Sequence, residues 1–74
     1  MTAADEERLR LLRSAIHSWG GTWSTRRAQH LYQAAYGPGD WRAKARADLS
    51  ALNSEGTLTL HDEPSRRTYT PKGA

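Results

Sequence analysis

The first part of the chain carries apolar residues at three- and four-residue spacing, which is the spacing of one face of an α-helix. This apolar stripe consists of Leu9, Leu12, Ile16 and Trp19. Thr2 is a suitable N-cap in front of the stripe, and Gly20-Gly21 is a suitable end behind it. The pattern therefore predicts a helix over residues 3–19.

The basic residues of this predicted helix, Arg8, Arg10 and Arg13, fall outside the apolar stripe. Leu11 lies off the centre of the stripe as well, so we expect its side chain to be exposed. An exposed leucine is a candidate contact for a partner.

A second amphipathic segment covers residues 24–36 and predicts another helix, capped by Ser24 or Thr25. Its apolar face consists of Ala28, Leu31, Tyr32 and Ala35. The helix cannot continue through Gly37-Pro38-Gly39, because the proline blocks the helical hydrogen-bond ladder and the glycines permit a sharp reversal. We therefore expect a tight turn after this helix.

Residues 40–54 predict a third helix, with Asp40 as its N-cap and Gly56 just beyond its end. The apolar face consists of Trp41, Ala45, Leu49 and Leu52, with Asp48 beside them. The opposite face carries small residues flanked by long basic ones, an arrangement that suits a helix entering a groove. An alanine-rich helix with ordinary surface charges is the alternative interpretation.

A β-hairpin, or wing, is predicted over residues 57–70. Strict alternation in Thr57-Leu58-Thr59-Leu60 is typical of a half-buried strand with both leucines inward. A polar loop is expected over residues 61–66, because Pro64 disfavours regular strand. The return strand begins at Arg67, with Tyr69 pointing inward.

Two helices joined by a short glycine-containing turn form a helix-turn-helix, and a following hairpin is its wing. The sequence thus predicts a single domain over residues 1–74, of class α+β, with the winged helix-turn-helix arrangement. In this topology a short strand at residues 22–24 pairs with the second hairpin strand, so that Trp23 points into the core. At 74 residues this core is small.

The formal net charge is +3, and its placement is more informative than its size. Residues 1–20 and 54–74 are each balanced, so the whole excess lies in the middle of the chain. The bases there are Arg26, Arg27, Arg42, Lys44 and Arg46. Scattered solvated charge is the simpler alternative, but it does not predict such a concentration in the helix-turn-helix.

We interpret this basic region as a surface for double-stranded DNA. Phosphate contacts are expected from Arg26 or Arg27, from Arg46, and from Arg66 or Arg67 at the hairpin tip. Base contacts are expected from Arg42, Ala43, Lys44 and Ala47 on the third helix, which would enter the major groove. Asp62 and Glu63 at the tip offset part of the positive charge of the arginines.

No motif for catalysis or for a bound metal or cofactor stands out in the sequence. The chain has no cysteine, and His17, His30 and His61 lack the spacing of metal ligands. We therefore expect a non-enzyme without a cofactor. The acidic N-terminus and the lack of a long apolar run predict a cytoplasmic protein without a membrane partner.

The C-terminal half resembles winged-helix transcription regulators of the MarR and PadR type. The run from Leu49 to Leu58 is similar to the family's L-x-x-L-x-x-x-G-x-L segment, and the run from Arg66 to Gly73 is similar to its R-x-Y-x-x-T-x-x-G ending. The resemblance implies a third helix in the major groove and a wing on phosphates or in the minor groove. Such regulators usually continue into a dimerisation helix. Because this sequence ends at Ala74, a dimer is expected to use the first helix or the exposed strand edge.

Two functions follow from these observations. The first is a small double-stranded DNA-binding protein, acting as a transcription regulator or as an accessory protein of a mobile element. The alternative is a protein–protein adapter on the same fold, which binds through the first helix or the wing, because fold alone does not determine function.

Overall fold

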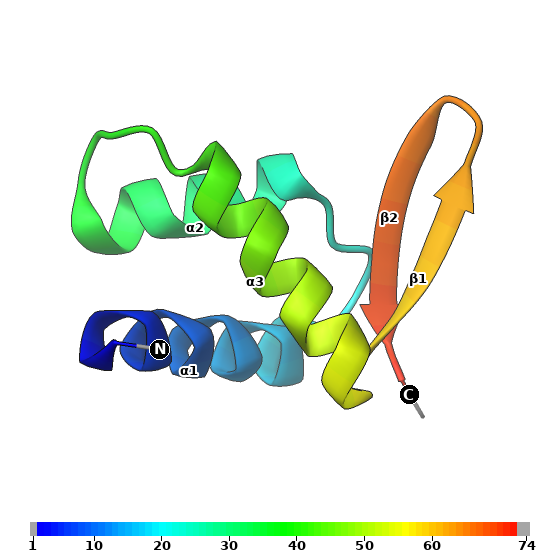
Figure 1. Ribbon diagram of the computed structural model, residues 1–74, viewed down its shortest axis with the longest axis horizontal. Coiled ribbons are helices and arrows are strands. Elements are labelled where there is room, and N and C mark those ends of the chain that lie inside the picture. The colour runs from blue at the N-terminus through cyan, green and yellow to red at the C-terminus, as the bar shows by residue number, and fades with distance from the viewer. Residues whose placement is uncertain (1, 73–74) are drawn as a thin grey trace.

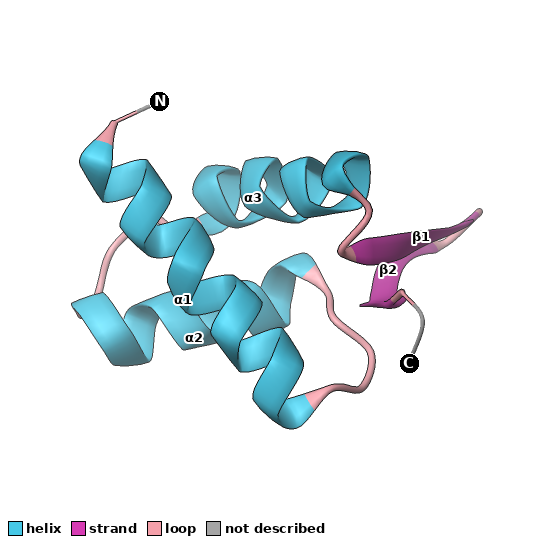
Figure 2. Cartoon of the chain, turned by 90° about the horizontal axis from the view of Figure 1, so that it is seen from below, coloured by secondary structure: helices cyan, strands magenta, loops and turns pink. Residues whose placement is uncertain are grey.

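Three helices precede an antiparallel hairpin in the computed structural model, which describes residues 2–72 (Figure 1). The helices are α1 (Ala3–Trp19), α2 (Thr25–Tyr36) and α3 (Arg42–Glu55), and the strands are β1 (Leu58–Glu63) and β2 (Arg66–Pro71). Figure 2 shows the hairpin at one side of the helices, away from the N-terminus. The predicted α+β class and the winged helix-turn-helix layout are confirmed.

Side-chain caps begin the first two helices. The hydroxyl of Thr2 accepts a hydrogen bond from the backbone N–H of Asp5 at 3.1 Å, and the Asp5 carboxylate accepts one from the Thr2 N–H at 3.3 Å. This reciprocal capping box confirms Thr2 as the cap. For α2, Ser24 rather than Thr25 is the cap, because its hydroxyl accepts from the Arg27 N–H at 3.2 Å.

The start of α3 differs from the prediction. Trp41 occupies the N-cap position without a side-chain cap, and the helix begins at Arg42, so Asp40 does not cap it. The Trp41 ring nitrogen instead donates to the Gly37 carbonyl at 2.9 Å. This local bond joins the start of α3 to the preceding reversal, and side-chain cap preferences do not predict it. Gly56 ends the helix in the left-handed region (φ 91°), as predicted.

The core lies between the three helices and the base of the hairpin. Its buried apolar residues are Leu9, Leu12, Ala15, Ile16, Trp23, Ala28, Tyr32, Ala45, Leu49, Leu52, Leu58 and Tyr69. Trp23 is fully buried and exchanges backbone hydrogen bonds of 2.6 and 2.7 Å with Tyr69 of β2. The predicted inward positions of Trp23 and Tyr69, and the pairing of residue 23 with the second strand, are confirmed.

Some residues on the predicted apolar faces lie outside this core. Trp19 is 64% exposed, because it is the last residue of α1 and the chain turns away at Gly20. Ala35 is exposed near the end of α2. Leu11, expected in solvent, is partly buried against the core.

The hairpin is longer and tighter than predicted. β1 continues through Glu63, which pairs with Arg66, so only Pro64 and Ser65 form the turn. The polar loop predicted over residues 61–66 is therefore wrong. Pro64 is tolerated because it occupies the turn itself, where its missing N–H removes no ladder hydrogen bond.

A buried network of polar side chains joins the three helices. The Arg8 guanidinium donates two hydrogen bonds to the Asp48 carboxylate, one from Nη2 to Oδ1 at 3.0 Å. The Tyr32 hydroxyl donates to the same carboxylate at 2.7 Å. Burial and this hydrogen bond raise the pKa of Tyr32, so the hydroxyl stays protonated and remains a donor.

The burial of Arg8 corrects the prediction that this residue falls outside the core face. Arg8 is only 8% exposed and Asp48 only 4%. Arg8 precedes Leu12 by one helical turn, so it faces the core, and Asp48 neutralises its charge there. Hydrogen bonding to Asp48 raises the pKa of Arg8, as expected for a paired guanidinium.

We expect the substitution Asp48→Asn to destabilise the fold by about 3 kcal/mol, because the buried Arg8 guanidinium loses its buried partner and keeps only the more exposed Asp5 carboxylate, 3.0 Å from its Nη1. Thermal unfolding followed by circular dichroism measures the effect. Arg13→Ala is the control, since Arg13 forms an exposed ion pair with Glu55 at 2.7 Å. Loss of such a pair costs at most about 1 kcal/mol. Equal unfolding temperatures for the two variants would contradict a stabilising role for the network.

Candidate nucleic-acid interface

An open hollow of about 350 Å³ lies where the exposed face of α3 meets the hairpin and the start of α2. It is lined by Ala43, Arg46, Ala47 and Ser50 from α3, by Arg67 and Tyr69 from β2, and by Thr25 from α2. We call this feature the α3–wing hollow. The structure thus brings together four of the predicted site residues: Ala43, Arg46, Ala47 and Arg67.

The α3–wing hollow is lined by small side chains that lie between two arginines, Arg46 and Arg67. Ala43, Ala47 and Ser50 leave room for a ligand to approach the α3 backbone. Arg46 and Arg67 bring positive charge from the helix and from the hairpin. Within residues 2–72 Arg46 forms no ion pair, so its guanidinium is available to an anion.

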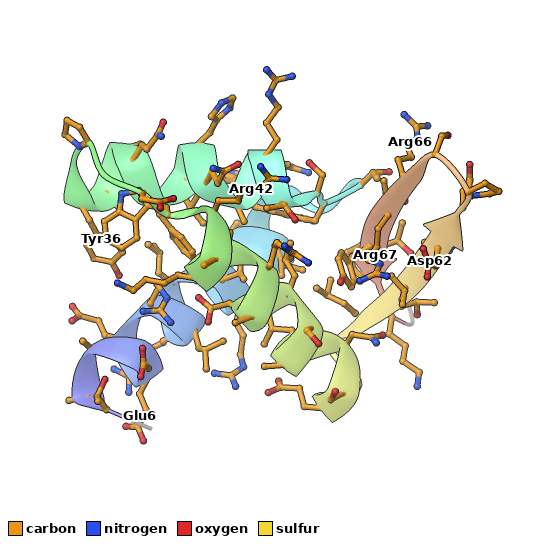
Figure 3. All side chains as sticks on the ribbon, turned by 45° about the horizontal axis from the view of Figure 1, so that its top comes forward. Glu6, Tyr36, Arg42, Asp62, Arg66 and Arg67 are labelled. Carbon is orange, nitrogen blue, oxygen red and sulfur yellow. The ribbon has the colours of Figure 1, made fainter. Side chains whose placement is uncertain are left out.

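Three further predicted arginines are exposed outside this lining. Arg42 is the first residue of α3, and Arg26 lies in the first turn of α2. Arg66 lies at the tip of the hairpin, where Figure 3 shows it pointing away from the helices. They extend the positive charge beyond the hollow on α3, α2 and the wing.

Lys44 lies apart from the other predicted site residues. It lines a different hollow, together with Glu7 of α1 and Tyr36 of α2. Its ammonium group lies 5.4 Å from the centroid of the Trp41 ring, within the range of a cation–π contact. Lys44 is therefore not brought together with Ala43 and Ala47.

Arg27 is engaged by the protein itself. Its Nη1 donates to the carbonyls of Gly20 and Thr22 at 2.9 and 3.0 Å, and its Cζ lies 3.9 Å from the centroid of the Trp23 ring. These contacts hold the α1–α2 connection against the start of α2. Sequence reasoning treated Arg26 and Arg27 as equivalent, but Arg26 is exposed and Arg27 is half-buried.

The charge of Arg67 is partly balanced on the hairpin. Its Nη2 lies 3.3 Å from the Asp62 carboxylate, and the two residues face each other in the β1–β2 register. This pair lies one step below the Glu63–Arg66 pair at the tip of the hairpin (Figure 3). Both side chains are more than half exposed, so an approaching anion can compete for Arg67.

Three residues that line the hollow were not among the predicted site residues: Thr25, Ser50 and Tyr69. Thr25 was considered only as a cap, although its place beside Arg26 at the start of α2 was a usable signal. Tyr69 was predicted as a core residue, which is correct, but one edge of it also reaches the hollow. Only the packing of the hairpin against α3 reveals this second role.

Residues 2–72 contain no group of three or more His, Cys, Asp or Glu side chains placed to hold a metal ion. In the same part of the chain, none of the helices has the length and apolar character needed to cross a membrane.

Comparisons of the chain with protein-family models, with curated proteins and with solved structures gave no match.

The contacts of Arg27 predict that Arg27→Ala destabilises the fold by about 1–3 kcal/mol, because hydrogen bonds to a charged group and a cation–π contact are both lost. The neighbouring substitution Arg26→Ala removes the same charge from an exposed site and should change stability by less than about 0.5 kcal/mol. Urea unfolding of the two variants gives the comparison. If both variants unfold at the wild-type urea concentration, Arg27 has no structural role.

Proposed function

We propose that the protein binds double-stranded DNA through the α3–wing hollow, with α3 directed at the major groove and the hairpin along the phosphate backbone. The observation that carries this proposal is the convergence of Arg46 and Arg67, from two different elements, on a hollow lined by small residues. DNA presents a regular row of phosphates on either side of a groove, so it matches cations separated by small side chains.

We assign different proposed roles to the predicted site residues. Arg46 and Arg67 are the proposed phosphate ligands, with Arg26 and Arg66 extending the phosphate contacts. Ala43 and Ala47 permit close approach, and each methyl group can contact a thymine methyl. Arg42, at the exposed start of α3, is the proposed base-reading cation.

Arg27 and Lys44 are not included among the proposed DNA ligands. Arg27 is committed to the Gly20 and Thr22 carbonyls, and Lys44 lines a hollow formed with α1. A role as a transcription regulator or as a mobile-element accessory protein remains part of this proposal. The resemblance to MarR- and PadR-type regulators supports it and stays a prediction.

The salt dependence of binding tests the proposal. We expect Arg46→Ala and Arg66→Ala each to lower the slope of log K against log salt by about 0.9, because each removes one phosphate contact and the release of its counterion. Fluorescence anisotropy with a labelled mixed-sequence duplex, at about 50 to 200 mM salt, measures this slope. Arg13→Ala removes the same charge from α1, away from the hollow, and should keep the wild-type slope.

Two outcomes would overturn the assignment. One is a wild-type protein that leaves the duplex unbound even at the lowest salt, which would favour the protein–protein adapter. The other is the same slope in all three variants, which would mean that DNA contacts general surface charge and not the α3–wing hollow.

The Arg67–Asp62 pair gives a second prediction. Asp62→Asn should strengthen DNA binding by up to about fivefold at low salt, because it frees Arg67 from an exposed ion pair worth up to about 1 kcal/mol. The same anisotropy assay measures the gain. Glu6→Gln removes an equal charge from α1, far from the hairpin (Figure 3), and should give a smaller gain. A gain no larger than that of Glu6→Gln would contradict the transfer of Arg67 from Asp62 to a phosphate.

A further inference from the structure

Another open hollow, of about 440 Å³, lies between α1 and the end of α2 and shares Glu7 and Tyr36 with the hollow that Lys44 lines. It is lined by Glu7, Arg10, Leu11 and Ser14 of α1 and by Ala35 and Tyr36 of α2. We call these six residues the α1–α2 face. The face shares no residue with the α3–wing hollow, and Figure 3 shows Tyr36 at the end of α2 that is far from the hairpin.

Tyr36 is the most prominent apolar group of the α1–α2 face. It is 41% exposed, which makes it one of two large hydrophobic residues exposed within residues 2–72. Its ring is held by aromatic neighbours, with centroids 6.2 Å away in Tyr32 and 5.4 Å away in Trp41. An aromatic ring that is already ordered loses little entropy on binding, and tyrosine is common among the residues that dominate interface energies.

The charges of the α1–α2 face are complementary to each other. Glu7 and Arg10 carry opposite charges. They are three residues apart in α1, so they are neighbours on one side of the helix. Within residues 2–72 neither forms an ion pair, whereas Arg8 and Arg13 on the same helix do. Leu11, Ala35 and Tyr36 supply apolar surface next to these two unpaired charges.

We propose that the α1–α2 face binds a second copy of this chain, related by a two-fold axis. A two-fold axis brings the same surface of both copies together, so Glu7 of each copy meets Arg10 of the other and both ion pairs form at once. Tyr36 and Leu11 of the two copies pack between these pairs. The face carries one acidic and one basic side chain, so it has no net positive charge to attract nucleic acid.

The size of the molecule is consistent with such a dimer. A specific interface buries at least about 500 Å² on each partner. That is about one tenth of the surface of 4956 Å² that the chain exposes, and it leaves the α3–wing hollow of both copies open. This inference does not depend on the proposed function, and its test contains no DNA.

A charge swap tests the dimer. Sedimentation equilibrium of the full chain measures the dissociation constant for the wild type, for Glu7→Arg, for Arg10→Glu and for the variant with both substitutions. We expect each single substitution to weaken dimerisation by about tenfold or more, because it places like charges together at two points of the interface. The double substitution should restore dimerisation, because it exchanges the charges and rebuilds both pairs.

Two further variants sharpen the result. Tyr36→Ser should weaken the dimer without a charge effect, and Arg66→Glu, at the far hairpin tip, should leave it unchanged. Circular dichroism checks that all variants fold, as expected for exposed positions. A wild-type protein that stays monomeric up to about 1 mM, or a double substitution that fails to restore the dimer, would overturn the proposal.

Discussion

The buried carboxylate of Asp48 is the point on which the arrangement of the helices depends. It accepts hydrogen bonds from Arg8 of α1 and from Tyr32 of α2, so a single residue of α3 fixes the positions of both other helices. Within residues 2–72 Asp48 has no other cation beside it, so turning away from Arg8 would leave its carboxylate buried without a counter-charge, at a cost of several kcal/mol. Because successive helical residues are about 100° apart, an inward Asp48 also directs Arg46 and Ala47 outward. The same interaction thus stabilises the fold and orients the surface proposed to bind DNA.

Much of this fold follows from local patterns in the sequence. The period of apolar residues and the caps at Thr2 and Ser24 are local features, and they predicted the bounds of the first two helices to within one residue. The inward positions of Trp23 and Tyr69 followed from topology and strand alternation. The burial of Arg8 could not be predicted from local patterns, because it depends on a tertiary contact. Arg8 carries a charge, which usually keeps a side chain at the surface. Its burial depends on Asp48, a partner 40 positions later in the chain.

The prediction of the candidate site was correct for the faces of α3 and wrong for some of the long basic side chains. The faces of α3 were assigned correctly, since Ala43, Ala47 and Ser50 lie opposite the buried residues. Long basic side chains are harder to place, because their charged ends reach several ångströms from the backbone. Arg27 turns back to the α1–α2 connection and Lys44 turns toward Trp41. Periodicity locates the Cα of such a residue, but neighbouring acceptors and rings determine where its charge lies.

In a protein with so small a core, the proposed binding surface and the core share a residue. Tyr69 is 5% exposed and exchanges backbone hydrogen bonds with Trp23, yet it also lines the α3–wing hollow beside Arg67. The hairpin is therefore attached to the core through the strand that carries the proposed phosphate ligand. Burial of Tyr69 fixes the backbone of β2 two residues from Arg67, so core packing sets where this arginine leaves the hairpin. The backbone positions of Arg46 and Arg67 are therefore both set by core packing, so a ligand that contacts both has to order only the side chains and not the elements that carry them.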